Sequence, residues 1–253
     1  MSGVLHDGQM RLEPPVIIPA QFNGPSRSGN GGYVCGLVGR RLADRLGADR
    51  PVTATLRVPP PLETVLAWRD EPGVVRLVAG VGAVVAEATA GTYAGTPVEP
   101  VPPDVAAQAY RDFEGYVDHP FPHCFVCGSA RTLGDGLLVW AGPVGDGRMA
   151  CPWSPPAAFC ADDGLLRREL VWAVLDCPGG WAAGIKANPM VLGRMTASVA
   201  RRPKVDEPCL VVADRRGTSG RKNHAATTLY GADGDIIGRS EQTWITIDIE
   251  AFS

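Results

Sequence analysis

The chain repeats one pattern in each of its two halves, a helix accompanied by strand-like segments. In the first half, apolar residues at near-helical spacing predict a helix that starts at Gly31 and Gly32 and ends at Gly47. In the second half, the apolar run of residues 167–183 predicts another helix. A helix enclosed by a sheet can be apolar on all sides. The pattern therefore predicts an α+β fold in which each of two repeats wraps an antiparallel β-sheet around one long central α-helix.

Strand-like segments accompany both predicted helices. In PVTATLRV, residues 51–58, apolar and polar residues alternate, which is typical of a strand with one buried face. The remaining strand-like segments are residues 63–69, 73–80 and 82–90 in the first half and residues 135–142, 147–153, 194–201, 208–216, 223–231 and 235–249 in the second half.

A proline-rich segment separates the two halves. Four prolines stand close together there: Pro97, Pro100, Pro102 and Pro103. Proline cannot donate the backbone hydrogen bond that a central strand needs. We therefore predict an N-terminal repeat at residues 1–95, a linker with one short helix at residues 96–122, and a C-terminal repeat at residues 123–253.

Composition and charge argue against several classes of function. The 253-residue chain has a net charge of −3, with charged residues spread throughout, so no nucleic-acid partner is expected. No apolar stretch reaches the roughly 18 to 20 residues of a membrane span. The first residues also lack the basic and then apolar pattern of a signal peptide. We therefore expect a cytoplasmic protein without a membrane partner.

The seven cysteines are dispersed and odd in number, which argues against a disulfide framework and agrees with a reducing compartment. Cys124 and Cys127 form a C-x-x-C pair directly after His123, but no second close pair of Cys or His follows at the spacing of a four-ligand zinc site. This arrangement favours a packed loop with a buried thiol pair. No metal and no cofactor are expected, and Cys177 is interpreted as a packing residue.

One carboxylate interrupts the apolar run ELVWAVLDCPGGWAAG, residues 169–184. Asp176 lies at its centre, directly before Cys177 and Pro178. One interpretation is a functional carboxylate placed where the proline ends or kinks the helix. The alternative is that Asp176 caps a second short helix that begins at Pro178.

The motifs HCFVCGSARTLGDGLLV and VWAVLDCPGGWAA resemble the small acyl-CoA thioesterases of the hotdog fold. GNGGYVCGLVGRRL in the first half resembles the N-terminal repeat of the double-hotdog acyl-CoA thioesterases of the thioesterase II type. The resemblance implies a double hotdog that hydrolyses an acyl-CoA or another acyl thioester, and it implies a homodimer.

The resemblance also implies roles for particular residues. Asp176 falls on the position of the catalytic acid, and Gln242 falls on that of a glutamine that helps to hold the attacking water. The family's threonine has no clear match, since Arg216 aligns with it and Thr218 follows two residues later. The family's His-Gly-Gly helix start corresponds to Asn30, Gly31 and Gly32 in the first repeat, and to Arg167, Arg168 and Glu169 in the second.

Superposing the two repeats by their helices places Asp176 opposite Gly39, so each repeat keeps a different half of the site. Within one helix, the glycine start and the acid position lie about nine residues apart, or roughly 13 Å. Antiparallel helices would bring the glycines of the first helix beside the acid of the second. We therefore predict one composite site per chain, in which backbone N–H groups of Gly31 and Gly32 bind the oxyanion and Asp176 acts as general base or nucleophile.

Other residues leave alternatives open. Asn30 is either a contact to the thioester or a helix cap. The basic loop of Arg215, Arg216, Arg221 and Lys222 is either a clamp for coenzyme A phosphates or a solvated turn. We assign Arg216, Thr218 and Arg221, with Asn30, to substrate binding.

Two other functions compete with hydrolysis. Hotdog hydratases pair the acid with a histidine about five residues further on, where this chain has Trp181, and none of the four histidines is close in sequence. A non-catalytic acyl-thioester-binding protein is the other alternative, because the family's threonine and its His-Gly-Gly are not matched.

Overall fold

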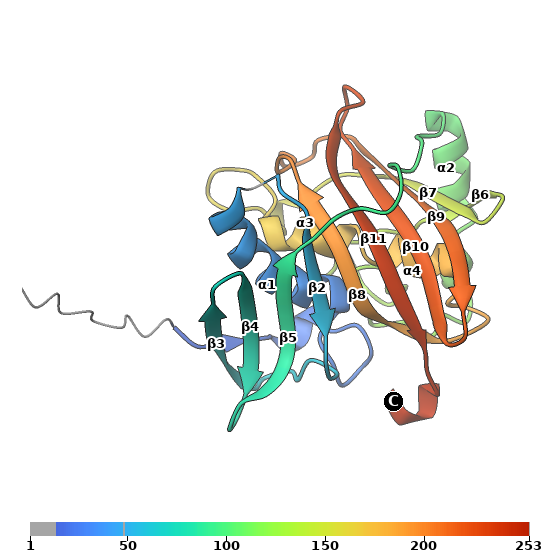
Figure 1. Cartoon of the computed structure of the whole chain (residues 1–253). Coiled ribbons are helices and arrows are strands. Elements are labelled where there is room, and N and C mark those ends of the chain that lie inside the picture. Colours follow the sequence, from blue (N-terminus) through green and yellow to red (C-terminus); the bar gives the residue numbers. More distant parts are fainter. Residues whose placement is uncertain (1–13, 48, 253) are drawn as a thin grey trace, which may run out of the picture.

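One continuous antiparallel sheet dominates the computed structural model, which describes residues 14–47 and 49–252. Within these residues the sheet has eleven strands in the order β1-β3-β4-β5-β2-β8-β11-β10-β9-β7-β6 (Figure 1). The strands are β1 Val16–Ile17, β2 Val52–Leu56, β3 Val65–Glu71, β4 Val74–Ala79, β5 Ala83–Ala90, β6 Gly142–Gly145, β7 Arg148–Trp153, β8 Met190–Val199, β9 Cys209–Ser219, β10 Lys222–Tyr230 and β11 Ile236–Thr246.

The sheet crosses from the first half of the chain to the second where β2 pairs with β8. Their register places Val52 opposite Ala197, and the hydroxyl groups of Thr53 and Thr196 lie 2.8 Å apart. The strands of both halves therefore belong to one sheet.

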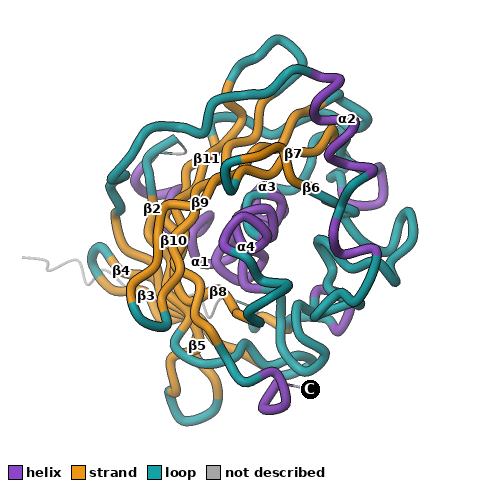
Figure 2. Tube along the Cα trace, turned by 90° about the vertical axis from the view of Figure 1, so that its right-hand side faces the viewer, coloured by secondary structure: helices purple, strands orange, loops and turns teal. Residues whose placement is uncertain are grey.

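The helices that build the core lie inside the curve of this sheet (Figure 2). They are α1 Gly31–Leu46, α3 Arg168–Val174 and α4 Cys177–Ala183. Helix α1 contacts β2, β4, β5 and β8, whereas α4 lies mainly against β7, β9 and β10 and also reaches β8 and β11. None of the helices in the described part of the chain is long and apolar enough to cross a membrane.

Glycines on one side of α1 allow it to lie against α3. A Cβ atom at Gly36 would stand 2.4 Å from the carbonyl oxygen of Glu169, and one at Gly39 would stand 2.5 Å from the ring of Trp172. Only a residue without a Cβ fits such distances. This close approach brings the N-terminus of α1 to the end of α3.

The prediction of one helix over residues 167–183 is wrong at its centre, because α3 ends at Val174 and α4 begins at Cys177. Pro178 has no backbone N–H and cannot continue the hydrogen-bond ladder of α3. The chain therefore restarts as a new helix after Asp176.

The strand prediction for residues 135–142 is also wrong, since the neighbouring strand β6 begins only at Gly142. Leu138 has a positive φ of 55°, which interrupts an extended chain. The N–H groups of Leu137 and Val139 instead donate to the carbonyl groups of Phe125 and Val126, both at 2.9 Å.

The proline-rich segment crosses the sheet over β10 and β11 before it enters helix α2 Pro103–Arg111 (Figure 1). The N–H of Val98 donates to Thr228 at 2.9 Å, and the hydroxyl of Tyr230 donates to the carbonyl of Val98 at 2.8 Å. Short 3-10 turns complete the described chain at Ala20–Phe22, Glu114–Tyr116, Ala157–Phe159 and Ile249–Phe252.

Candidate active site

Asp176 lies at the break between α3 and α4 and is 1% exposed. Its Oδ2 atom accepts hydrogen bonds from the N–H of Gly32 at 2.9 Å and from Nδ2 of Asn30 at 3.1 Å. Its side chain makes no capping hydrogen bond to α4, although it occupies the N-cap position. A second helix does begin here, but the carboxylate is directed to the start of α1 instead of its own helix.

The surroundings of Asp176 favour the protonated form of its side chain. Burial raises the pKa of Asp176 from 3.8 to about 7, against the lowering effect of the hydrogen bond from Gly32. The charge of Cys124 adds to the increase, and the hydrogen bond from Asn30 opposes it. The Oδ1 atom is buried and has no hydrogen-bond partner among the described residues.

Of the two roles that the sequence leaves open for Asn30, the structure shows the helix cap, and it adds a contact to Asp176. Oδ1 of Asn30 accepts from the N–H of Tyr33 at 2.9 Å, which caps α1, and its Nδ2 donates to Asp176. The start of α1 is therefore linked to the carboxylate by the helix's own cap.

The two glycine amides at the start of α1 are not equivalent. The N–H of Gly32 is occupied by Asp176, and a Cβ atom at Gly32 would stand 2.4 Å from the Cβ of Asp176. The N–H of Gly31 makes no hydrogen bond within the described chain, and Gly31 lines a cavity together with Asp176. Gly31 thus offers the donor that is still available to a ligand.

The cavity beside Asp176 has a volume of about 410 Å³. Large apolar side chains form much of its wall: Phe121, Trp181, Ile185, Met190, Leu192 and Trp244. The exposed Arg57 and Arg221 also line it. The cavity therefore joins an apolar interior to two arginines, of which Arg57 pairs with Glu87, and it holds one buried carboxylate between α1 and α4.

Gln242 lies behind the site and does not line this cavity. Its Nε2 donates to the carbonyl of Leu175 and to Oγ of Ser240 (2.9 Å), and its Oε1 accepts from Nε1 of Trp244 at 2.9 Å. Because Leu175 directly precedes Asp176, Gln242 holds the break between the helices that carries the carboxylate.

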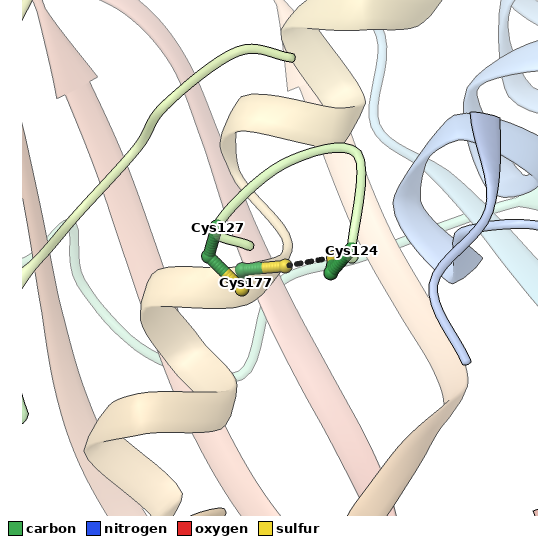
Figure 3. A group of neighbouring side chains, drawn as sticks. All are labelled: Cys124, Cys127 and Cys177. Atoms are coloured by element: carbon green, nitrogen blue, oxygen red, sulfur yellow. Dashed lines mark hydrogen bonds between the residues drawn. The ribbon is translucent and has the colours of Figure 1, made fainter. Parts of the chain in front are cut away.

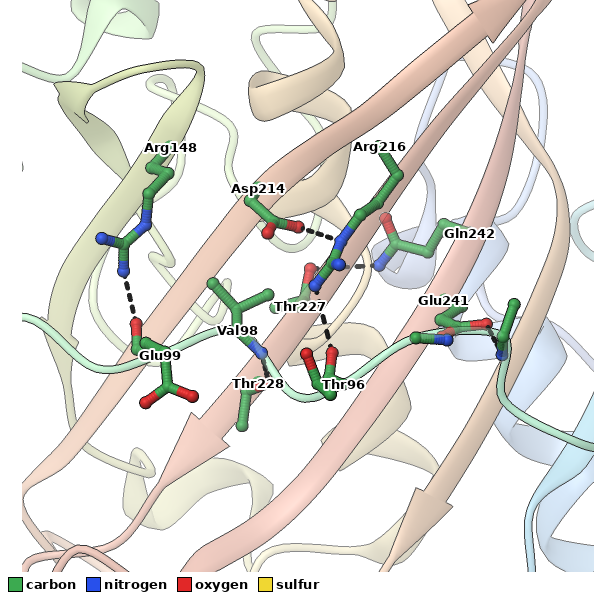
Figure 4. A network of polar contacts seen from close by, with 12 residues as sticks. Thr96, Val98, Glu99, Arg148, Asp214, Arg216, Thr227, Thr228, Glu241 and Gln242 are labelled. Atoms are coloured by element: carbon green, nitrogen blue, oxygen red, sulfur yellow. Dashed lines mark hydrogen bonds and ion pairs between the residues drawn. The ribbon is translucent and has the colours of Figure 1, made fainter.

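The other residues assigned to substrate binding, Arg216, Thr218 and Arg221, do not lie together in one place. Arg216 donates to Asp214 at 2.7 Å and to the carbonyl of Thr96 at 3.1 Å, against the proline-rich segment (Figure 4). Thr218 bonds Asn223 within the β9–β10 hairpin at 3.0 Å. Of the basic loop, only Arg221 lines the cavity with Asp176.

Among the residues that the sequence did not place at the site, His119, Cys124, Cys127 and Cys177 also line this cavity. The ring of His119 is held by backbone on both sides, with Nε2 3.1 Å from the carbonyl of Cys127 and Nδ1 accepting from the N–H of Phe121 at 2.9 Å. Burial lowers the pKa of His119. The motif HCFVCG marked this loop, but no periodicity showed that it folds against Asp176.

The sulfur atoms of Cys124, Cys127 and Cys177 lie within 4.8 Å of one another, so the expected pair of buried thiols is a group of three. Thiolates are ligands for zinc and other soft metals. Among the described residues this is the one group of His, Cys, Asp or Glu side chains close enough to share a metal ion.

No family model matches the chain, and no curated protein matches it. Solved structures match it over nearly its full length. The tesB protein of Mycobacterium avium subsp. paratuberculosis shares 16% identity with a TM-score of 0.55, covering 89% of this chain and 90% of that one. A "putative thioesterase" from Novosphingobium aromaticivorans shares 15% identity with a TM-score of 0.60, covering 95% and 97%.

A third structure, a conserved protein of unknown function with a hotdog fold from Alicyclobacillus acidocaldarius, shares 17% identity with a TM-score of 0.56 and covers 92% of both chains. At these identities the similarity defines the fold. The chain has the hotdog fold.

Proposed function

We propose that the chain is a double-hotdog thioesterase that hydrolyses an acyl-CoA or a related acyl thioester at one composite site. The observation that supports this most directly is the 2.9 Å contact between the N–H of Gly32 and Asp176, beside the unoccupied N–H of Gly31. The likeness to a tesB protein and to a protein described as a thioesterase agrees with this activity.

In the proposed architecture, residues 1–95 and 123–253 are the two hotdog repeats, and residues 96–122 link them. The first repeat supplies the start of α1, and the second supplies the carboxylate. The opposite combination would pair Gly39 with Arg168, which offers no acid. One active site per chain follows.

In the proposed mechanism, the carbonyl oxygen of the thioester accepts a hydrogen bond from the N–H of Gly31. This donor, at the positive end of α1, stabilises the oxyanion that forms during attack. The unpaired Oδ1 of Asp176 then either takes a proton from an attacking water or attacks the carbonyl carbon itself. Hydrolysis releases the carboxylic acid and the thiol.

Asn30 and Gln242 act as positioning residues in this mechanism. Asn30 ties Oδ2 of Asp176 to the start of α1, which leaves Oδ1 for the substrate. Gln242 fixes the carbonyl of Leu175 and so the position of the next residue, Asp176. The polar atoms of the Gln242 side chain all bond to other protein groups. We therefore propose that Gln242 positions the carboxylate and does not hold the attacking water.

The cavity supports a substrate with an apolar acyl group and an anionic carrier. Its apolar walls favour burial of hydrocarbon or an aromatic ring. Arg221 is placed to pair with a phosphate of coenzyme A, and Arg57, which pairs with Glu87, is a second guanidinium that lines the same cavity. The homodimer and the cytoplasmic location stay predictions. Light scattering on the purified chain tests whether it is a homodimer.

The test is hydrolysis of a panel of acyl-CoA substrates by the full chain, with products separated by chromatography. We expect free CoA to form, and Asp176→Asn to lower kcat/KM about 10²- to 10⁴-fold, as loss of a general base does. Full activity in Asp176→Asn would contradict the assignment. Acyl-CoA binding without product would show the non-catalytic binding protein instead.

The hydratase alternative has less support. A hydratase needs a histidine that can exchange a proton with substrate, but both ring nitrogens of His119 contact backbone groups. Formation of a hydroxyacyl-CoA from an enoyl-CoA in the same panel would show that this alternative is correct.

A further inference from the structure

The cluster of Cys124, Cys127 and Cys177 has no part in the hydrolysis described above. Cys124 comes from the loop before β6, and Cys177 is the first residue of α4. Their Sγ atoms face each other at 3.7 Å, and Cys127 completes the group (Figure 3). All three line the cavity at 3% to 6% exposure, so a small molecule inside the cavity can contact them.

The donors around the cluster favour a thiolate at Cys124. Nδ2 of Asn30 lies 3.8 Å from Sγ of Cys124 and 3.9 Å from that of Cys177. Hydrogen bonds from the thiols of Cys127 and Cys177, and from the N–H groups of Cys127 and Val126, lower the pKa of Cys124 well below its ordinary value. Burial and the neighbouring Cys124 raise the pKa values of the Cys127 and Cys177 thiols, so these two thiols remain protonated and can donate. A stabilised thiolate beside a protonated thiol is the arrangement of an oxidation-sensitive pair.

We propose that this cluster is an oxidation site, at which a small hydroperoxide converts Cys124 and Cys177 into a disulfide. The thiolate sulfur of Cys124 attacks the terminal peroxide oxygen, the O–O bond breaks, and the alkoxide or hydroxide leaves and takes up from the solvent the proton that Cys124 had released. Cys124 is now a sulfenic acid. The sulfur of Cys177 attacks it, the S–O bond breaks, and water leaves. Two thiols are oxidised and one hydroperoxide is reduced.

A structural metal site fits the same residues less well. Structural zinc sites take four protein ligands, and this group contains three. The amide of Asn30 that approaches Cys124 and Cys177 presents N–H, which donates a hydrogen bond and cannot ligate a metal. Disulfide formation needs only the two facing sulfurs.

A Cys124–Cys177 disulfide would also affect the proposed hydrolysis. Cys177 is bonded directly to Asp176, and Asn30 donates to the carboxylate as well as to both sulfurs. Drawing the two sulfurs from 3.7 Å to a bonding distance of about 2 Å requires the side chain of Cys177, next to the carboxylate, to change position. Misplacement of a catalytic group by about 1 Å costs on the order of 100-fold in rate.

The experiment treats the reduced full chain with hydrogen peroxide, blocks remaining thiols and maps cross-links by mass spectrometry. We expect one dominant cross-link, between Cys124 and Cys177, that dithiothreitol reverses. Cys124→Ser and Cys177→Ala should each abolish this cross-link, while Cys160→Ser, a thiol outside the cluster, should retain it. Thermal unfolding of each variant shows that it is folded.

Three results would overturn the proposal. They are a dominant Cys124–Cys127 cross-link, oxidation that stops at single thiols, and stoichiometric zinc on the purified chain that protects all three thiols. The mapping does not depend on hydrolysis, so it decides the proposal even if no acyl-CoA is turned over. If hydrolysis is found, the oxidised protein should be 10- to 100-fold slower and recover on reduction.

Discussion

Asp176 is the residue at which stability and the proposed function oppose each other. A buried carboxylate is costly in its ionised form. The donors Gly32 and Asn30 satisfy Oδ2, and Oδ1 remains without a partner in the described chain. A general base needs this free oxygen, whereas a structural carboxylate would be expected to have it paired.

The first prediction concerns the pH dependence of stability. The folded protein raises the pKa of Asp176 to about 7, so its contribution to the free energy of unfolding falls as pH rises from about 4 to 7. Asp176→Asn removes this cost. At pH 8 we expect the variant to be more stable than the wild type, by at most about 4 kcal/mol, with the difference fading toward pH 4.

Urea unfolding of both proteins at pH 4, 6 and 8 measures this difference. A variant that is less stable than the wild type at pH 8 would show that the fold favours the ionised carboxylate, which contradicts a raised pKa at Asp176.

The second prediction concerns Gly32. In Gly32→Ala the new Cβ would stand 2.4 Å from the Cβ of Asp176, so the carboxylate must move. We expect a loss of about 1–3 kcal/mol in stability and about 100-fold in kcat/KM. Gly39→Ala is the matched control, since its Cβ would meet the ring of Trp172 instead, further along α1. It should lose stability but keep most of its activity, and equal losses of activity would count against a site at Gly32.

Part of the site could be predicted from residues alone. The glycine start of α1 and the carboxylate at the centre of an apolar run were both visible in the sequence, and the structure places Gly32 and Asp176 in contact. The contributions of His119, Cys124 and Cys127 were not visible, because a loop without periodicity carries no information on what it packs against.

At the scale of elements, the break between α3 and α4 determines where the carboxylate lies. Pro178 explains why α3 cannot continue, and the carbonyl of Leu175 at the break accepts hydrogen bonds from Gln242 and Ser240. From Pro178 alone it was not possible to predict whether the helix bends or whether a new helix begins. That choice depends on β11, which is distant in sequence and supplies hydrogen-bond donors to the carbonyl of Leu175.

The third prediction concerns Gln242. Gln242→Met keeps the size of the side chain but leaves Nε1 of Trp244 without its acceptor, at a cost of about 1–3 kcal/mol. Because Gln242 acts through Leu175, we expect kcat to fall about tenfold while KM stays nearly constant. Thr243→Ala, on the neighbouring residue of β11, should change neither constant. An increase in KM alone for Gln242→Met would indicate a direct contact with substrate.

At the scale of the whole molecule, the two halves of the chain form one sheet through β2 and β8. Periodicity predicted most strands of both halves. The prediction for residues 135–142 was wrong because the apolar pattern does not reveal the positive φ at Leu138. Strand order and the contact between halves depend on pairings far apart in sequence, which alternation within a single strand does not encode.

The fourth prediction follows from this shared sheet. We expect the full chain to unfold in one cooperative transition, with tryptophan fluorescence and far-ultraviolet circular dichroism changing together in denaturant. Two separated transitions would show that the halves are independently stable and that the β2–β8 junction contributes little.

The composite site requires the start of α1 and Asp176 to act on one thioester carbonyl. The most direct measurement is a crystal structure of the protein with an acyl-CoA analogue whose thioester sulfur is replaced by a methylene group. We predict a carbonyl oxygen about 3 Å from the N–H of Gly31, with Oδ1 of Asp176 facing the carbonyl carbon directly or through one water. An analogue whose carbonyl contacts neither Gly31 nor Asp176 would contradict the composite site.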